Sequence, residues 1–195
     1  MSATAEILVY LVQTVLTLYL LAMLLRFLLQ LVRADFYNPI CQFLVKITNP
    51  AVLPLRKVIP GYAGLDMSSL ILCILLQLAG IIFVLWLLSV AMPSIMQLLA
   101  WAVLGVLGLL VNIYFFALLA SIIISWVAPG SQNPAIHLVY QITEPVMAPF
   151  RKLIPPMGGL DLSPILLFVL INVLQIALRH MAQSVGLPAG LVIGL

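Results

Sequence analysis

This sequence has very little charge. Eight Lys or Arg and five Asp or Glu make up 7% of its 195 residues, against about 25% in an ordinary soluble domain. No charged residue occurs between Met67 and Thr143, and hydrophobic residues reach 65% of the chain. A chain of this composition cannot cover a soluble surface with charge. The composition therefore excludes an ordinary soluble domain and indicates an integral membrane protein.

Residues that commonly carry out chemistry are also scarce. The chain has two histidines and two cysteines, and they form no cluster with metal-ligand spacing. It has no phosphate-binding glycine loop, no Ser-His-Asp set and no potassium-filter motif. We therefore expect a non-enzymatic protein with no cofactor and no direct contact with nucleic acid.

Four apolar stretches are long enough to cross a membrane, which takes about 20 residues. They lie at 7–32, 67–91, 97–127 and 163–183, and Met92-Pro93-Ser94 is typical of a turn between the second and the third. An even number of spans places both termini on one side and both long connections on the other. Basic residues gather in the connections, so the positive-inside rule predicts cytoplasmic connections and outside termini.

The sequence repeats itself after 95 residues without a gap. The matched groups are Asn38-Pro39 with Asn133-Pro134, Arg56-Lys57 with Arg151-Lys152, and Asp66 with Asp161. Such a repeat indicates two copies of one structural unit. The predicted units are residues 1–94, with a connection at 34–66, and residues 95–195, with a connection at 129–161.

The predicted fold is therefore all-α, with four transmembrane helices in two parallel tandem repeats. The repeats are parallel because each contains two spans and enters the membrane the same way. A pseudo-twofold four-helix bundle is the simplest arrangement. Each repeat also carries an amphipathic interfacial or re-entrant loop, and the protein is expected in a bacterial inner (plasma) membrane.

Each connection begins with the pattern of a short amphipathic helix. The asparagine of the Asn-Pro pair can cap it, and the proline suits its first position. Apolar residues then recur at i, i+3, i+4 and i+7, which predicts a helix of about ten residues, too short to span. Pro50 and Pro145 predict its end, because the residue before a proline disfavours helix. Whether this helix lies on the membrane or enters it stays open.

The basic pairs, Arg56-Lys57 and Arg151-Lys152, have two interpretations. They lie between prolines near the membrane surface, where a basic residue gains about 1 kcal/mol beside anionic lipid. They either anchor the protein to the bilayer through anionic lipid headgroups or form a surface for an unidentified membrane or cytoplasmic protein partner. The sequence leaves homo-oligomer formation open.

Few ionisable side chains fall within or beside the spans. Arg26 lies inside the first span, and we interpret it as snorkelling to the nearby interface; its counterpart in the second unit is Ser121. Asp66 and Asp161 precede the second span of each unit and are interpreted as helix caps, with an ion or proton role as the alternative.

Uncharged polar residues in the spans predict hydrogen bonds between helices, and tryptophans near span ends predict an aromatic belt. The polar residues are Gln13, Thr17, Gln77, Asn112, Asn172 and Gln175. The tryptophans are Trp86, Trp101 and Trp126.

The repeated motifs resemble those of the YggT family, which is related to the YlmG proteins of cyanobacteria and chloroplasts. The motifs are Asn-Pro, Thr-x-Pro-x-x-x-Pro-x-Arg-Lys-x-Ile-Pro and Gly-Leu-Asp-x-Ser, each present twice. The resemblance covers about the whole chain and implies a small inner-membrane protein with no established catalytic activity. Relatives are associated with osmotic-shock tolerance and ion uptake, with cell division and nucleoid distribution, and in plastids with cytochrome b6 maturation.

Two functions are compatible with these observations. The first is an inner-membrane scaffold or assembly factor that presents basic amphipathic loops at the cytoplasmic face, with a link to cell division or membrane-complex biogenesis. The alternative is an osmotic-stress-related ion channel or transporter. The residues expected at an interface or partner site are Arg56, Lys57, Arg151, Lys152, Asn38, Pro39, Asn133, Pro134, Asp66, Asp161 and Arg26.

Overall fold

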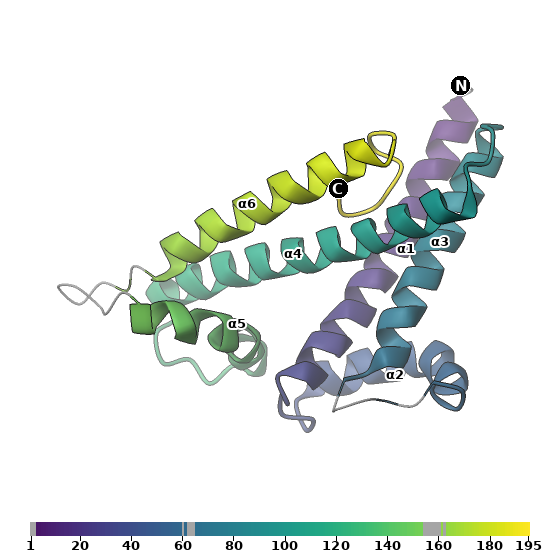
Figure 1. The fold of residues 1–195 in the computed structure, drawn as a ribbon. Helices are drawn as coiled ribbons and strands as arrows, with labels where there is room; N and C mark the ends of the chain where they lie inside the picture. The colour runs from purple at the N-terminus through teal and green to yellow at the C-terminus, as the bar shows by residue number, and fades with distance from the viewer. Residues whose placement is uncertain (1–2, 60, 62–64, 154–160, 162) are drawn as a thin grey trace.

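In the computed structural model, the described part of the chain forms six α-helices (Figure 1). It describes residues 3–59, 61, 65–153, 161 and 163–195. The helices are α1 (Ala3–Leu31), α2 (Pro39–Arg56), α3 (Met67–Leu87), α4 (Ile95–Val127), α5 (Pro134–Leu153) and α6 (Ser163–Ser184). No strand occurs among the described residues, and the all-α prediction is confirmed. Parts of the repeated motifs lie outside the described ranges, among them Pro60, Gly64, Pro155, Pro156 and Gly159.

Four helices, α1, α3, α4 and α6, are long and apolar enough to cross a membrane, which confirms the four predicted spans. Large apolar side chains on all four face outward. Leu18 of α1, Trp86 of α3, Phe116 of α4 and Val169 of α6 are each more than half exposed. Soluble proteins rarely expose apolar surface on this scale. The chain is therefore a multi-pass membrane protein whose outer surface faces lipid.

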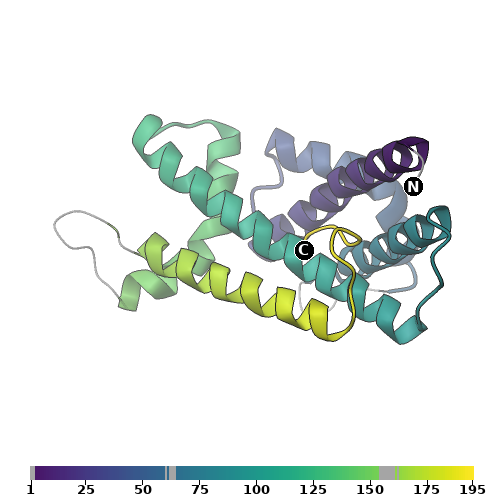
Figure 2. The ribbon, with the colours of Figure 1, turned by 90° about the horizontal axis from the view of Figure 1, so that it is seen from above.

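The spans form two helical hairpins, α1 with α3 and α4 with α6, which cross each other steeply (Figures 1 and 2). They meet where Leu109 of α4 packs in one cluster with Leu20 and Leu24 of α1. This steep crossing differs from the pseudo-twofold four-helix bundle that was the simplest arrangement expected from the sequence. In the residues after α6, Leu191 and Val192 pack against α3 and α4.

Residues 185–195, which we call the returning segment, double back after α6 as non-helical chain (Figure 2). Four span side chains donate hydrogen bonds to its backbone carbonyls: Gln13 at 3.2 Å, Gln77 at 3.4 Å, Asn112 at 3.2 Å and Trp101 at 3.0 Å. Non-helical backbone at membrane depth needs partners from the protein. These polar side chains supply them, so their position inside apolar spans has a structural explanation.

The other polar residues of the spans bond in two ways. Gln175 of α6 donates to the side-chain oxygen of Asn112 on α4 at 3.0 Å, which confirms a predicted hydrogen bond between helices. Thr17 and Asn172 donate to carbonyls of their own helices. Trp101 is buried, and its Nε1 donates to the returning segment at 3.0 Å. Its assignment to an aromatic belt was wrong, because the belt prediction used distance along the chain and not burial.

Two glycines of α4 allow the returning segment to pack closely against this helix. A Cβ atom on Gly105 would collide with Val192, and one on Gly108 would collide with the backbone of Gly194. The segment therefore approaches α4 more closely than any residue with a side chain at these positions would allow.

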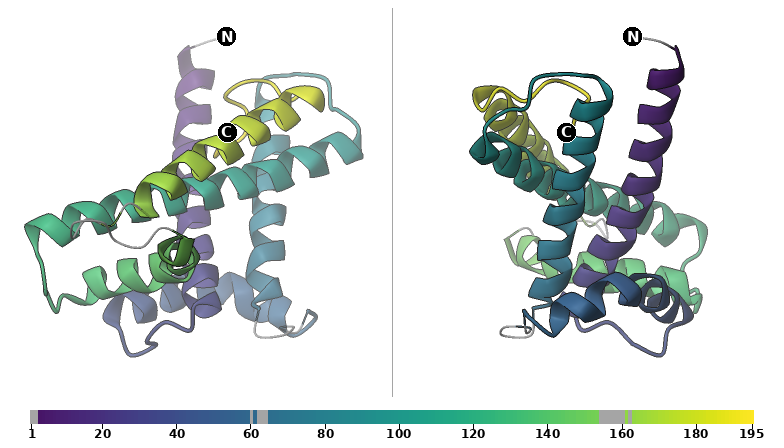
Figure 3. Two further views of the ribbon diagram at one scale, coloured as in Figure 1. Left: turned by 60° about the vertical axis from the view of Figure 1, so that its left-hand side comes forward. Right: turned by 90° about the vertical axis from the view of Figure 1, so that its right-hand side faces the viewer.

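The amphipathic helices α2 and α5 lie across the end of the molecule opposite the N-terminal end of α1 (Figures 1 and 3). Both begin at their Asn-Pro pairs as predicted, but they continue through Pro50 and Pro145. The predicted helix ends were wrong. In α2 the buried stripe of Leu44, Thr48 and Val52 continues past Pro50, so packing offsets the cost of about 3 kcal/mol for an internal proline.

Candidate functional site

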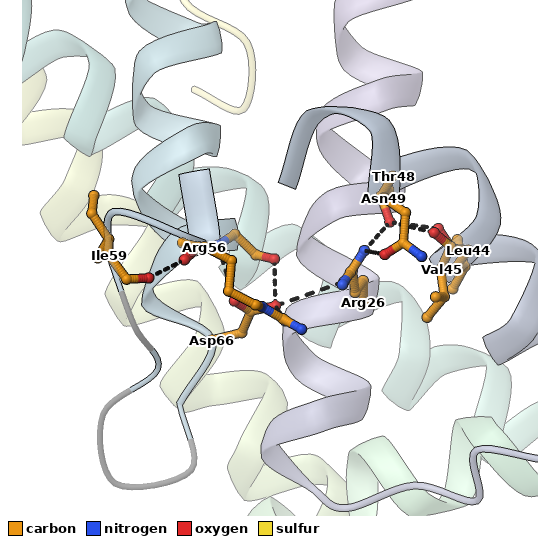
Figure 4. Close-up of polar contacts among 10 residues, drawn as sticks. Arg26, Leu44, Val45, Thr48, Asn49, Arg56, Ile59 and Asp66 are labelled. Carbon is orange, nitrogen blue, oxygen red and sulfur yellow. Dashed lines mark hydrogen bonds and ion pairs between the residues drawn. The ribbon is translucent and has the colours of Figure 1, made fainter. Parts of the chain in front are cut away.

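Arg26 lies near the end of α1 with only 6% of its surface exposed. Its NH1 donates to Thr48 Oγ1 at 2.7 Å and to Asn49 Oδ1 at 2.9 Å, both on α2. Its Nε lies 3.7 Å from Asp66 Oδ2 at the start of α3. The last turns of α1 pack between α2 and the beginning of α3, and this packing places the guanidinium among the three polar side chains (Figure 4).

Asp66 caps α3 and also binds arginine. Its Oδ1 accepts the backbone N–H of Ser69 at 3.3 Å, and its Oδ2 accepts the Ser69 hydroxyl at 2.7 Å, so the capping prediction is confirmed. The same Oδ2 accepts Arg56 NH2 at 2.6 Å. Figure 4 shows Arg56 on one side of this carboxylate and Arg26 on the other. We call Arg26, Thr48, Asn49, Arg56 and Asp66 the first polar cluster.

The interpretation of Arg26 as a snorkelling residue was wrong. A snorkelling arginine extends along the surface until its head reaches water, whereas this guanidinium turns inward. Burying a charge is unfavourable unless it is paired and hydrogen-bonded. Thr48 and Asn49 from α2 and the carboxylate of Asp66 provide those partners, and none of the three is adjacent to Arg26 in sequence.

The second half of the chain builds a related but different cluster. Arg151 Nε donates to Asp161 Oδ2 at 2.8 Å, and its NH1 contacts both carboxylate oxygens of Glu144 at 2.7 Å. Asp161 Oδ1 accepts the backbone N–H of Ser163 at 2.9 Å, the hydrogen bond expected of a capping aspartate. We call Arg151, Glu144, Asp161 and Ser163 the second polar cluster.

The charges of the second polar cluster shift each other's titration. Hydrogen bonding to Asp161 raises the pKa of Arg151, with a further contribution from Glu144. Burial raises the pKa of Asp161, but hydrogen bonds from Arg151 and Ser163 outweigh it and leave that pKa below its ordinary value. Both shifts show that the charged forms are the stabilised ones here.

In both basic pairs, the arginine and the lysine have different environments. Arg56 and Arg151 turn inward to carboxylates. Lys57 and Lys152 are exposed, and neither forms an ion pair with another described residue. The lysines, rather than the arginines, are therefore the basic groups available to a partner or to lipid.

The Asn-Pro pairs act as helix starts, and one of them also joins the two halves. Asn38 and Asn133 each accept the backbone N–H two residues further on at 2.9 Å. Asn38 is buried, and its Nδ2 also donates to the carbonyl of Pro134 at 2.9 Å. Asn133 is exposed. Pro39 and Pro134 occupy the first positions of α2 and α5, so the contact ties the start of α2 to the start of α5.

Sequence reasoning missed Thr48, Asn49 and Glu144 as partners. The repeat carried a signal for them. Where the first half has Arg26 and Asn49, the second half has Ser121 and Glu144. Together these two changes remove a positive charge and add a negative one at positions that the fold brings close. No group of three or more His, Cys, Asp or Glu side chains suited to a metal ion occurs in the described part of the chain.

Comparison with known proteins assigns the chain to a family. The sequence model described as CCB3/YggT matches residues 5–88 and 100–182. The chain belongs to the CCB3/YggT family. The matched segments contain all six helices in large part, and the expected YggT resemblance is confirmed.

Family members extend from bacteria to plastids. The chain is 50% identical to the uncharacterized protein PA0392 of Pseudomonas aeruginosa, over 95% of both chains. It is 37% identical to YggT of Escherichia coli K12, over 92% of this chain and 93% of that one. The chloroplast protein CCB3 of Arabidopsis thaliana, whose name refers to cofactor assembly of complex C, is 34% identical over 36% of this chain and 41% of its own. No solved structure matches.

Proposed function

We propose that this CCB3/YggT protein is a non-catalytic assembly scaffold of the bacterial inner membrane that docks subunits of a membrane complex. The observation that carries the proposal is the joining of α2 and α5 at one end of the molecule. Asn38 bonds to the α5 carbonyl of Pro134, and Leu44 and Cys41 share an apolar cluster with Leu138 and Ile142. The two helices therefore form one surface, which we call the α2–α5 face.

The α2–α5 face exposes the side-chain types that protein interfaces use. Phe43 is 59% exposed and Tyr140 is 37% exposed, and aromatic residues are enriched at interfaces. Lys46, Lys57 and Lys152 are exposed on the same two helices or next to them. An acidic, amphipathic segment of a partner subunit fits this combination of aromatic and basic groups.

The remaining polar groups support a scaffold rather than an enzyme. Both clusters of charged residues connect helices to one another, and Gln13, Gln77 and Asn112 hold the returning segment. The Arabidopsis relative is named for cofactor assembly, and we extend an assembly role to this chain. We also propose that residues 1–94 and 95–195 are parallel repeats and that the α2–α5 face is cytoplasmic, where the positive-inside rule places its lysines.

The structure indicates which basic residues to change in a test of this function. Replacing Arg56 or Arg151 would disturb the fold, so the exposed lysines are the residues to change. The paired variant Lys57→Glu with Lys152→Glu reverses the charge of the face, and Lys57→Arg with Lys152→Arg is the matched control. Cells lacking the protein are complemented with each, and membrane complexes are resolved by native electrophoresis with mass spectrometry.

The expected result is that at least one membrane complex fails to assemble without the protein while its subunits persist. The wild type and the arginine control restore it, and the glutamate variant does not, although it reaches the same membrane level. An unchanged set of complexes in the deletion strain, or full restoration by the glutamate variant, would overturn the proposal.

The alternative, an ion pathway linked to osmotic stress, rests on the polar side chains inside the spans. Those side chains are engaged: Gln77 and Asn112 bond to the returning segment, and Gln175 bonds to Asn112. Purified protein in liposomes distinguishes the two functions. Ion flux above that of empty liposomes under an osmotic or voltage load would favour the pathway over the scaffold.

A further inference from the structure

A cavity of about 400 Å³ opens between α1 and α2, beside the first polar cluster. One part of its lining is basic and comes from Arg26, Arg33 and Arg56. Another part is apolar and includes Leu44 and Leu53 of α2. The lining thus combines positively charged and apolar side chains. It lies at the end of α1 that α2 crosses (Figure 1).

The charge beside this cavity is not balanced. Arg26 and Arg56 share the single carboxylate of Asp66, so the first polar cluster carries a net charge of +1. Arg33 adds another positive charge to the cavity lining. The nearby Asp35 does not line the cavity, and its Oδ1 accepts the backbone N–H of Tyr37 at 2.9 Å.

One donor of the buried guanidinium has no hydrogen bond. Arg26 is 94% buried, from its 6% exposure, and its Nε is buried without a hydrogen-bond partner. An unsatisfied buried donor on a charged group costs more free energy than one on a neutral group. This Nε lies 3.7 Å from Asp66 Oδ2, but Arg56 shares the same carboxylate, so an anion in the cavity would balance the second positive charge.

The geometry points to a binding site for a phosphate-bearing anion in this cavity, supplied by the headgroup of an acidic phospholipid. Guanidinium groups match the oxygens of a phosphate in geometry and charge, and three of them line the space. The apolar lining from α2 suits the first carbons of an acyl chain. The site goes beyond the assembly role, and its lining includes none of the exposed lysines of the α2–α5 face.

The second polar cluster, at the matching position of the repeat, differs from the first in the residues that would favour an anion. Ser121 replaces Arg26, and Glu144 replaces Asn49. Glu144 and Asp161 both bind Arg151, so the second polar cluster has a net charge of −1. That cluster has no positive charge left for an anion to neutralise. A glutamate at position 49 should therefore form an ion pair with Arg26 and so replace the bound anion.

The test uses Asn49→Glu, which copies the second half, and Asn49→Gln as the neutral control. The full chain is purified in detergent, and native mass spectrometry measures its binding of phosphatidylglycerol and of phosphatidylcholine with the same acyl chains. Wild type and Asn49→Gln should prefer phosphatidylglycerol. Asn49→Glu should lose about tenfold or more of that affinity, as expected when one charge-assisted hydrogen bond is lost.

A second variant keeps the proposal testable if Asn49→Glu does not fold. Arg33 is exposed, so Arg33→Gln is expected to fold and to weaken phosphatidylglycerol binding severalfold, whereas Arg33→Lys retains it. Equal affinity of the wild type for the two lipids would overturn the proposal, as would unchanged binding in folded Asn49→Glu. Full displacement of the lipid by millimolar inorganic phosphate would overturn the lipid as the source of the anion.

Discussion

The two polar clusters occupy matching places in the two halves of the chain but carry opposite charge. The first has two arginines around one buried aspartate, and Asp66 has 1% of its side chain exposed. The second has one arginine between two carboxylates, and Asp161 has 31% of its side chain exposed. One sequence motif therefore supports both a buried and a partly hydrated ion-pair network. The difference in net charge arises because the second half has Ser121 in place of Arg26 and Glu144 in place of Asn49.

The halves also differ in the chain that comes after their last helix. A short turn joins α3 to α4 in the first half. In the second half the returning segment comes after α6 and bonds to Gln13 of α1, Gln77 of α3 and Asn112 of α4. The second half thus contributes a connection that holds both hairpins together, and the first half contributes the more deeply buried charge.

The largest predicted effect comes from removing the buried carboxylate. Asp66→Asn retains a good capping side chain but leaves Arg26 and Arg56 without their negative charge. Breaking a buried ion pair from one side costs about 3–5 kcal/mol. We expect a loss of that size in the free energy of unfolding, measured by denaturant titration of the purified protein in detergent.

Asp161→Asn is the matched variant in the second half. Its arginine keeps Glu144, and the pair is partly exposed, so the expected loss is about 0–1 kcal/mol, as for surface ion pairs. Equal losses in the two variants would contradict the distinction between a buried and a hydrated cluster.

Much of this architecture could be predicted from the sequence, and the exceptions share a cause. The spans and the caps at Asn38 and Asp66 follow from local patterns, namely apolar length and a capping residue before a helix. The passage of α2 through Pro50 and the inward turn of Arg26 depend on side chains supplied by other helices. Local patterns contain no information about such partners. The available signal was the comparison of Arg26 and Asn49 with their counterparts in the repeat, Ser121 and Glu144.

The second prediction concerns the returning segment. Gly108→Ala places a Cβ atom against the backbone of Gly194, which cannot move aside without displacing the segment. Overpacking of this kind typically costs about 1–3 kcal/mol. We expect lower stability together with faster hydrogen–deuterium exchange in residues 185–195.

Gly80→Ala on α3 is the matched control for this change. Its new Cβ would meet only the end of the Leu16 side chain, which can rotate away, so the returning segment should keep its wild-type exchange rate. If residues 185–195 of Gly108→Ala kept the wild-type exchange rate, the segment would not depend on this close approach.

The smallest predicted effect is a pH dependence that arises at Asp161 in the second polar cluster. The pKa of Asp161 lies below its ordinary value of 3.8 because Arg151 and Ser163 bind the charged form. A lowered pKa means that the stabilisation is complete above the ordinary pKa and is lost as the pH falls through the lowered one. The difference in Tm between wild type and Asp161→Asn should therefore be constant from pH 7 to about pH 5 and vanish in stronger acid. Glu6→Gln, at an exposed site on α1, controls for the loss of one carboxylate, and a difference that grows toward acid would contradict the assignment.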